Sequence, residues 1–163
     1  MIKIEKVTRS DELGAVLALQ KLAFHSEAVL YNDFSLPPLL QTEKQLLEEF
    51  HNGKTFLKHM SGDDTIGSIR AALDKNNYCH IGRLVVHPEY QQLGIGTALM
   101  QAIEAAFPAC KEYRIFTGHK SLHVIHLYKK LGYSIFDKQD AGSHIIVYMQ
   151  KTNYRPLNQA VND

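Results

Sequence analysis

Two glycines, Gly94 and Gly96, lie between an apolar run rich in β-branched residues and an amphipathic helical pattern. The run stops at Pro88, which has no N–H to give to a neighbouring strand, so strand, turn and helix are predicted in that order. A helix that begins on such a turn directs several unpaired backbone N–H groups at one point, and its dipole makes that point positive. The residues therefore predict an anion site suited to a phosphate or a pyrophosphate.

The spacing in this turn separates three kinds of phosphate loop. The Walker motif G-x-x-x-x-G-K-[ST] does not occur, and the dinucleotide motif G-x-G-x-x-G fails because Leu99 stands at the third glycine position. The run Gln91-Gln-Leu-Gly-Ile-Gly96 fits Q/R-x-x-G-x-G/A. Between a strand and a helix, this motif resembles the acyl-coenzyme A pyrophosphate loop of the GNAT superfamily, the general N-acetyltransferases. The alternative is an ordinary turn whose glycines only relieve backbone strain.

A second motif, Ser121-x-x-Val-Ile-x-Leu-Tyr-Lys-Lys-Leu-Gly-Tyr133, resembles the family signature N-x-x-A-I-x-L-Y-x-K-L-G-F/Y. It departs at Ser121, where asparagine is usual, and at Val124, where alanine is usual. A serine hydroxyl still hydrogen-bonds a pantetheine arm, but it lacks the donor and acceptor pair of an amide. The resemblance implies that coenzyme A contacts residues of both motifs and of the preceding strand: Leu84, Val85, Val86, Gln91, Gln92, Leu93, Gly94, Ile95, Gly96, Thr97, Ser121, Ile125 and Tyr128.

The resemblance also implies roles in acyl transfer. It places Tyr128 beside the coenzyme sulfur as the acid for the leaving thiolate, the alternative being a core tyrosine. Counted back from the glycine turn, His80 occupies the position of a catalytic glutamate or histidine in several family members, and a neutral imidazole accepts a proton. The alternatives are a histidine that only lines the cleft and a water chain, which Tyr78 is able to hold. The backbone N–H of Val85 or Val86 is the expected oxyanion donor.

The faces of the strand that leads into the turn follow from alternation, provided that no bulge intervenes. One face then carries Tyr78, His80, Gly82, Leu84 and Val86, and the other carries Cys79, Ile81, Arg83, Val85 and His87. Two roles for Arg83 stay open, namely binding of an acidic substrate group and a surface ion pair.

The acceptor pocket of this family is walled by the loop between the first two helices and by the last hairpin, here residues 31–40 and 139–144. Tyr31, Asp33 and Phe34 form an aromatic and acidic set suited to a cationic amine. Alternatively, these aromatic side chains only fix the loop to the core. The resemblance implies an acetyl-coenzyme A-dependent N-acetyltransferase that acts on a primary amine of a small molecule or peptide, by direct attack in a ternary complex.

Apolar periodicity and turn residues predict the elements that position these groups. A strand over 1–7 is followed by a helix capped by Ser10 that fades near His25, and residues 26–41 are predicted to be a loop. The capping box Thr42-Glu-Lys-Gln45 opens a second helix, which ends at Asn52-Gly53. The remaining elements are strands over 54–60, 65–73 and 78–86, a helix to Phe107, a strand over 112–117, a helix over 119–131 ending at Gly132, and a hairpin of 133–136 with 144–149.

This order matches the α/β (α+β) GNAT fold, a mixed sheet that splays open between its fourth and fifth strands and is flanked by about four helices. We expect one domain over 1–151 and a polar, loose tail over 152–163. The chain has 163 residues and a net charge of +1, so no global field favours nucleic acid or an anionic membrane. It has two cysteines without metal spacing and no apolar run of 18 residues, which favours a cytoplasmic protein without a metal. Whether it forms a homodimer stays open.

Two competing functions are weighed against the enzyme. The first is a non-catalytic acyl-coenzyme A-binding regulatory module on the same fold, against which Tyr128 and a titratable His80 argue. The second is a nucleotide-phosphate binder of another class, against which the missing third glycine and the missing Walker lysine argue.

Overall fold

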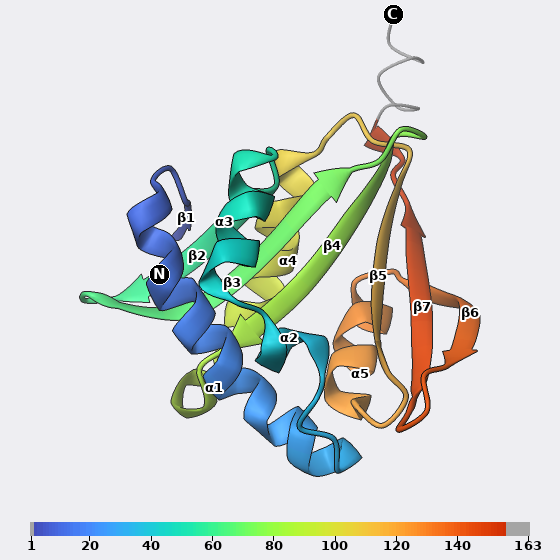
Figure 1. Ribbon diagram of the computed structural model, residues 1–163. Coiled ribbons are helices and arrows are strands. Elements are labelled where there is room, and N and C mark those ends of the chain that lie inside the picture. Colours follow the sequence, from blue (N-terminus) through green and yellow to red (C-terminus); the bar gives the residue numbers. More distant parts are fainter. Residues whose placement is uncertain (1, 156–163) are drawn as a thin grey trace, which may run out of the picture.

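The protein is built on one mixed sheet, seen in a computed structural model that describes residues 2–155. The strand order is β1-β2-β3-β4-β5-β7-β6, and every neighbouring pair is antiparallel except β4 and β5. The strands, shown as arrows in Figure 1, are β1 (Ile4–Lys6), β2 (Thr55–Ser61), β3 (Asp64–Leu73), β4 (Tyr78–Val86), β5 (Glu112–Gly118), β6 (Ser134–Asp140) and β7 (Ile145–Thr152).

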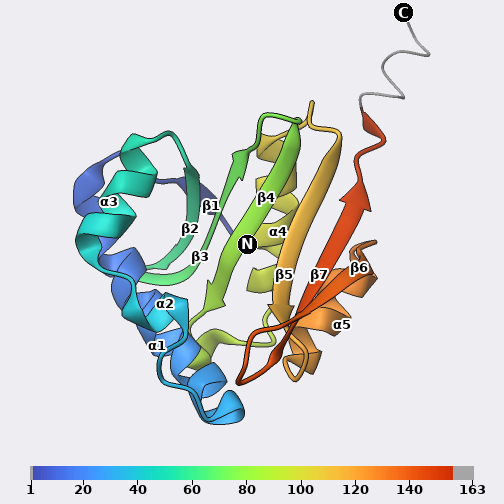
Figure 2. The same cartoon turned by 45° about the vertical axis from the view of Figure 1, so that its right-hand side comes forward.

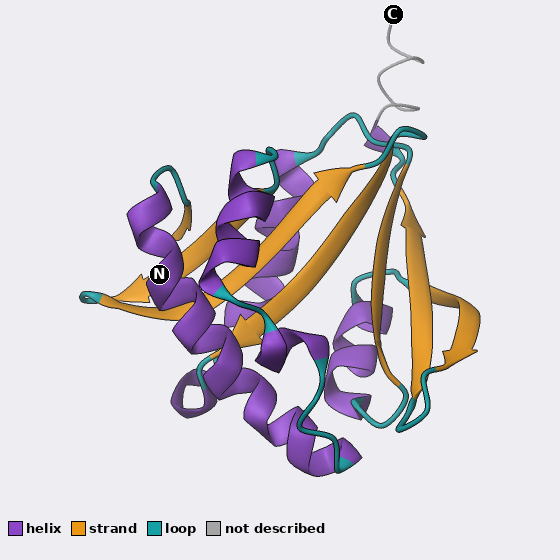
Figure 3. Ribbon diagram, in the orientation of Figure 1, coloured by secondary structure: helices purple, strands orange, loops and turns teal. Residues whose placement is uncertain are grey.

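Helices cover both faces of this sheet (Figure 3). The helices are α1 (Leu13–Tyr31), α2 (Pro37–Leu40), α3 (Glu43–His51), α4 (Ile95–Ala106) and α5 (Leu122–Lys130), with short 3-10 turns at Ser10–Glu12 and Pro88–Tyr90. The larger core cluster joins α4 and α5 to the sheet, and a second cluster joins α1 and α3 to the other face. The structure thus confirms the predicted GNAT fold.

Strands β4 and β5 diverge after a short stretch of parallel pairing (Figure 2). Only Tyr78, Cys79 and His80 of β4 pair with β5. Beyond them, the edge of β4 that faces β5 has no strand partner within residues 2–155. This confirms the predicted splay, and it leaves backbone groups of β4 free for a ligand in the split.

A β-bulge in β4 overturns the predicted strand faces. Arg70 of β3 pairs with Gly82 and Ser68 pairs with Val85, so β4 has one more residue than β3 in this interval. Arg83 takes up the extra residue in a left-handed conformation, with φ of 51°. As a result Leu84 and Val86 pack on the same core as Cys79 and Ile81, and no longer share the face of His80.

The prediction of a loop over 26–41 is wrong for most of that range. Helix α1 continues to Tyr31 and ends at Asn32, whose φ of 49° is left-handed. A third small core explains the extension, because Ala28 and Tyr31 are buried against Leu36. Ser10 does not cap α1 either, since it begins the 3-10 turn that precedes the helix.

Two other local predictions hold. Thr42 and Gln45 form the expected reciprocal capping box at the start of α3. Gly132 follows α5 with φ of 99°, the left-handed conformation that favours glycine after a helix.

The chain around 151–153 is more ordered than expected, because β7 includes Lys151 and Thr152, and Asn153 donates to the carbonyls of Pro108 and Cys110. The rest of the expected tail, 156–163, lies outside the described residues.

One helical stretch, Ser10–Tyr31, is long and apolar enough by composition to cross a membrane. In this fold α1 packs on β3 and β4 and buries one face in the domain. The same composition suits a helix that covers a core.

Candidate active site

A cavity of about 870 Å³ occupies the split between β4 and β5. Its lining comes from the end of α1, the segment before α2, the turn before α4, helix α5 and the last hairpin, together with β4 and β5. The cavity therefore joins the predicted coenzyme region and the predicted acceptor region in one space.

The turn before α4 has the geometry of an anion site. Gly94 is the residue before the helix, with φ of 84°, and no side chain caps the helix within the described part of the chain. The first four backbone N–H groups, those of residues 94–97, therefore have no helical acceptor. Gln91 supports the turn by donating from Nε2 to the carbonyl of Val86, 3.4 Å away. Donors of this kind fit the pyrophosphate of coenzyme A.

Most of the residues predicted to contact coenzyme A line this cavity. They are Leu84, Val85, Val86, Gln91, Gln92, Gly94, Ile95, Gly96, Thr97, Ser121 and Tyr128. Two do not: Leu93 is exposed to solvent, and Ile125 is buried in the core under α5. The backbone of Leu93 still belongs to the turn, so only its side chain is removed from the prediction.

Tyr128 lies in the wall of the cavity and is almost fully buried. Burial raises the pKa of its hydroxyl above the ordinary value, and the nearby negative charge of Glu27 acts in the same direction. A tyrosine hydroxyl is protonated at neutral pH even without such a shift, so Tyr128 carries the proton that a proton donor needs.

His80 lies outside the residues that line the cavity. Its side chain is 53% exposed, and Nε2 is 2.7 Å from Oδ2 of Asp74, in the turn that precedes β4. This contact is the main reason why the pKa of Asp74 falls below its ordinary value. Sequence counting thus selected a histidine on the correct strand that does not reach the cavity from this position.

Glu27 is a cavity residue that the sequence analysis missed. It projects from the last part of α1, which the sequence predicts as a loop, and its side chain is 17% exposed. Ser121 Oγ donates to Glu27 Oε2 at 2.6 Å. Had the predicted helix been extended to Tyr31, Glu27 would lie one helical turn before Tyr31 and on the same face, next to a residue already predicted to line the acceptor pocket.

A chain of hydrogen bonds fixes this carboxylate. Because the proton of Ser121 goes to Glu27, Tyr31 is the donor in the 2.7 Å contact between its hydroxyl and Ser121 Oγ. The backbone N–H of Lys120 in turn donates to the Tyr31 hydroxyl at 3.0 Å. Ser121, predicted to contact pantetheine, lines the cavity and also connects α5 to α1 across the split.

The predicted acceptor residues separate into two groups. Tyr31 and Asp33 line the cavity, whereas Phe34 is exposed and stacks beside His25. Asp33 accepts from Ser143 Oγ at 2.7 Å, which is the main reason why the pKa of Asp33 is lowered. This contact connects the segment before α2 to the last hairpin, the two walls that the resemblance implied.

Arg83 also lines the cavity. Its Nε atom is buried and has no hydrogen-bond partner within the described chain. A surface ion pair, one of the two roles left open, is absent from residues 2–155. Those residues also include no group of three or more histidine, cysteine, aspartate or glutamate side chains arranged to hold a metal.

A comparison with protein families agrees with the class of protein that this fold and cavity define. The model of the acetyltransferase (GNAT) family matches residues 22–133, and the chain belongs to that family. No curated protein sequence matched the chain.

Solved structures share this fold at low sequence identity. The PaiA N-acetyltransferase of Thermoplasma acidophilum, in complex with coenzyme A, has a TM-score of 0.77 at 21% identity over 93% of this chain and 99% of its own. The ribosomal-protein-S18-alanine N-acetyltransferase of Escherichia coli has a TM-score of 0.75 at 15% identity over 94% of both chains. The phosphinothricin acetyltransferase of Sinorhizobium meliloti, in complex with AcCoA, has a TM-score of 0.73 at 17% identity over 93% and 88%.

Proposed function

We propose that this protein transfers the acetyl group of acetyl-coenzyme A to a primary amine of a small molecule or peptide, by direct attack in a ternary complex. One observation carries the proposal. A single cavity contains an uncapped helix N-terminus suited to pyrophosphate, a buried protonated tyrosine and a fixed carboxylate. In this proposal the helix N-terminus binds the coenzyme, the tyrosine acts as the acid, and the carboxylate attracts the amine of the acceptor.

On the coenzyme side, the pyrophosphate accepts from the N–H groups of residues 94–97. The pantetheine arm lies along the edge of β4 that has lost its partner strand, which brings the thioester toward Tyr128. At the reacting carbon, the amine nitrogen forms its bond and the carbon–sulfur bond then breaks. A backbone N–H at Val85 or Val86 holds the oxyanion, and Tyr128 gives its proton to the leaving thiolate.

On the acceptor side, Glu27 is the group best placed to receive the amine. Its carboxylate lies close enough to Tyr128 to influence the pKa of that hydroxyl, and Ser121 fixes its orientation. An anion there attracts an ammonium group and accepts its proton, directly or through one water. His80, with its imidazole held by Asp74 outside the cavity, is the weaker candidate for this role.

Two measurements test the proposal. Calorimetry with coenzyme A, NAD and ATP should show binding of coenzyme A alone, and Gly96→Val should weaken it by roughly 2 kcal/mol, the scale of lost charge-assisted hydrogen bonds. A Cβ at Gly96 would meet the Leu127 side chain at 3.5 Å, an ordinary contact, and thermal unfolding of Gly96→Val checks that the two further methyl groups leave the fold intact. Equal affinity in a folded Gly96→Val protein would contradict the assignment.

The second measurement is free thiol release from acetyl-coenzyme A across polyamines, amino acids, aminoglycosides and peptides. Release that depends on an amine supports the enzyme. Binding of coenzyme A with no amine-dependent release would instead support the non-catalytic module.

A further inference from the structure

Arg83 occupies an unusual position at the edge of the cavity. It takes the left-handed conformation at the bulge of β4, where a long side chain is uncommon. The bulge sends the following residues, Leu84 and Val86, to the core under α4, whereas the Arg83 side chain lies near Arg70 and Glu49 on the face covered by α1 and α3. A backbone distortion therefore places Arg83 in the wall of the cavity.

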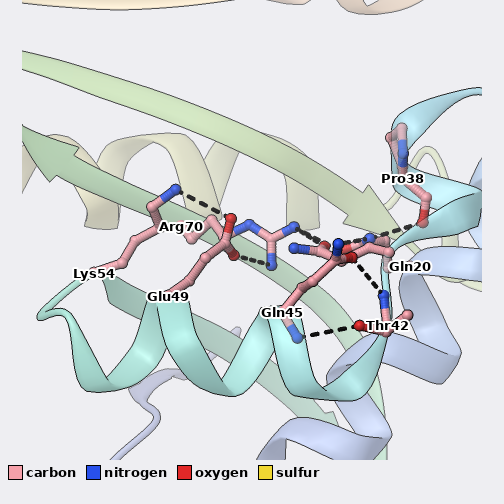
Figure 4. A network of polar contacts seen from close by, with 8 residues as sticks. Gln20, Pro38, Thr42, Gln45, Glu49, Lys54 and Arg70 are labelled. Carbon is pink, nitrogen blue, oxygen red and sulfur yellow. Dashed lines mark hydrogen bonds and ion pairs between the residues drawn. The ribbon is translucent and has the colours of Figure 1, made fainter.

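Arg70 is the centre of a polar network with α1, α3 and the segment before α3 (Figure 4). Arg70 donates from Nη2 to Gln20 at 2.7 Å and to Gln41 at 2.9 Å, and its Nη1 is 3.3 Å from Glu49. Lys54 Nζ is also 3.3 Å from Glu49. The carboxylate of Glu49 thus lies beside two other cations, although its buried Oε2 atom makes no hydrogen bond within residues 2–155.

Arg83 adds a third positive charge to that single carboxylate. Burial lowers the pKa of Arg83, and Glu49 opposes this only by its charge, because the two side chains do not form an ion pair. Burying a cation without a partner is costly, so such groups are normally paired. The excess positive charge faces a space large enough for a ligand.

We propose that Arg83 binds a carboxylate of the acceptor, so that the acceptor is an amino acid or a short peptide with a free C-terminal carboxylate. This inference rests on the proposed acetyl transfer and names its substrate class. The acceptor carboxylate meets the guanidinium, which matches its planar geometry with two donors, and the amine meets Glu27. The cavity thus holds opposite charges for the two ends of a zwitterion.

The test uses N-acetylated products and so does not depend on turnover. Calorimetry measures binding of N-acetyl α-, β- and γ-amino acids and N-acetyl dipeptides, each paired with its C-terminal amide, to the protein with and without coenzyme A. In the wild type, at least one acid should bind tenfold or more tightly than its amide. Arg83→Gln should reduce that ratio to within twofold and leave the affinity for coenzyme A unchanged, whereas Arg83→Lys should keep part of the preference.

Arg9→Gln is the matched control, because Arg9 is an exposed arginine in an ion pair with Asp11. It should keep the full preference for the acid. The inference is overturned if no acid binds more tightly than its amide, or if the preference survives in Arg83→Gln. The competing explanation is that Arg83 only neutralises Glu49. In that case Arg83→Gln should lower the melting temperature and leave the ratio of acid to amide affinity unchanged. Failure of coenzyme A to bind the wild type would instead refute the acetyltransferase itself.

Discussion

At the scale of single residues, Tyr128 and Glu27 are the proposed reactive groups of the cavity, and both line it. The two side chains come from α1 and α5. Burial and the negative charge of Glu27 raise the pKa of the Tyr128 hydroxyl above its ordinary value. The carboxylate keeps its position because Ser121 donates to it.

Tyr128→Phe should lower the maximal rate by roughly 10²-fold, the usual contribution of a positioned acid, because only the hydroxyl is removed. Coenzyme A affinity should be unchanged. Steady-state thiol release combined with calorimetry checks both quantities. An unchanged rate, with chemistry shown to limit turnover, would remove Tyr128 from the mechanism.

Glu27→Gln and His80→Gln separate the two candidates for the acceptor side. The glutamine at 27 keeps size and hydrogen bonding but loses charge and basicity, so kcat/KM should fall by roughly 10²-fold. The glutamine at 80 should change kcat/KM less than threefold, because His80 contacts Asp74 outside the cavity. The pH–rate profile of both variants provides the check. Loss of the acidic limb of the pH–rate profile in His80→Gln, with Glu27→Gln keeping it, would restore the histidine as the base.

At the scale of elements, the split depends on a close contact between α1 and β5. The Tyr31 side chain lies directly over Gly118, where a Cβ would collide with its ring and hydroxyl. Only glycine permits the approach that lets Tyr31 accept from Lys120 and donate to Ser121.

Gly118→Ala should therefore lower the free energy of unfolding by roughly 1–3 kcal/mol, the usual range for overpacking. It should also weaken binding of the amine acceptor, because Tyr31 and Ser121 then no longer hold the Glu27 carboxylate in place. Gly82→Ala is the stability control, because a Cβ there meets open space. Urea unfolding measures both variants. The free-energy changes of Tyr31→Phe and Gly118→Ala should not add in the double variant, because the two residues are in contact. Simple additivity of the two changes would argue against the contact.

At the scale of the whole molecule, an ion pair fixes the start of α1 to the sheet. Glu12 Oε1 is 2.7 Å from Lys58 Nζ, and both side chains are largely buried. The hydrogen bond with Lys58 is the main reason why the pKa of Glu12 falls from its ordinary value of 4.5 to about 2. The folded state thus prefers the ionised carboxylate more strongly than the unfolded state does.

A lowered pKa makes a stability contribution that is complete above pH 4.5 and is lost as the pH falls toward 2. At about 1.4 kcal/mol for each pKa unit, this contribution is on the order of 3 kcal/mol. Denaturant unfolding of the wild type and Glu12→Gln between pH 2.5 and 6 measures it. The free energy of unfolding of the wild type should exceed that of Glu12→Gln at pH 6, and the difference should shrink as the pH falls through this window. A difference that does not vary with pH would contradict the assignment.

The sequence by itself determined the parts of this protein that depend on a few neighbouring residues. The glycine turn, the capping box at Thr42, the bounds of β4 and the left-handed Gly132 follow from local hydrogen bonding and backbone freedom. The alternation of strands and helices gave the fold class, because burial of apolar faces requires these periods.

Only the tertiary structure decided which side chains meet in the cavity. Helix α1 reaches Tyr31 because a small core forms with Leu36, a contact that the local pattern does not encode. That extra length brings Glu27 to the cavity. The bulge at Arg83 depends on the pairing of β4 with β3, and one extra residue reverses every side chain beyond it. Glu27 replaced His80 as the candidate base because α1 is longer than predicted, whereas Arg83 stayed a candidate binder of an acidic group. Short-range patterns specify elements, whereas contacts between distant segments specify the site.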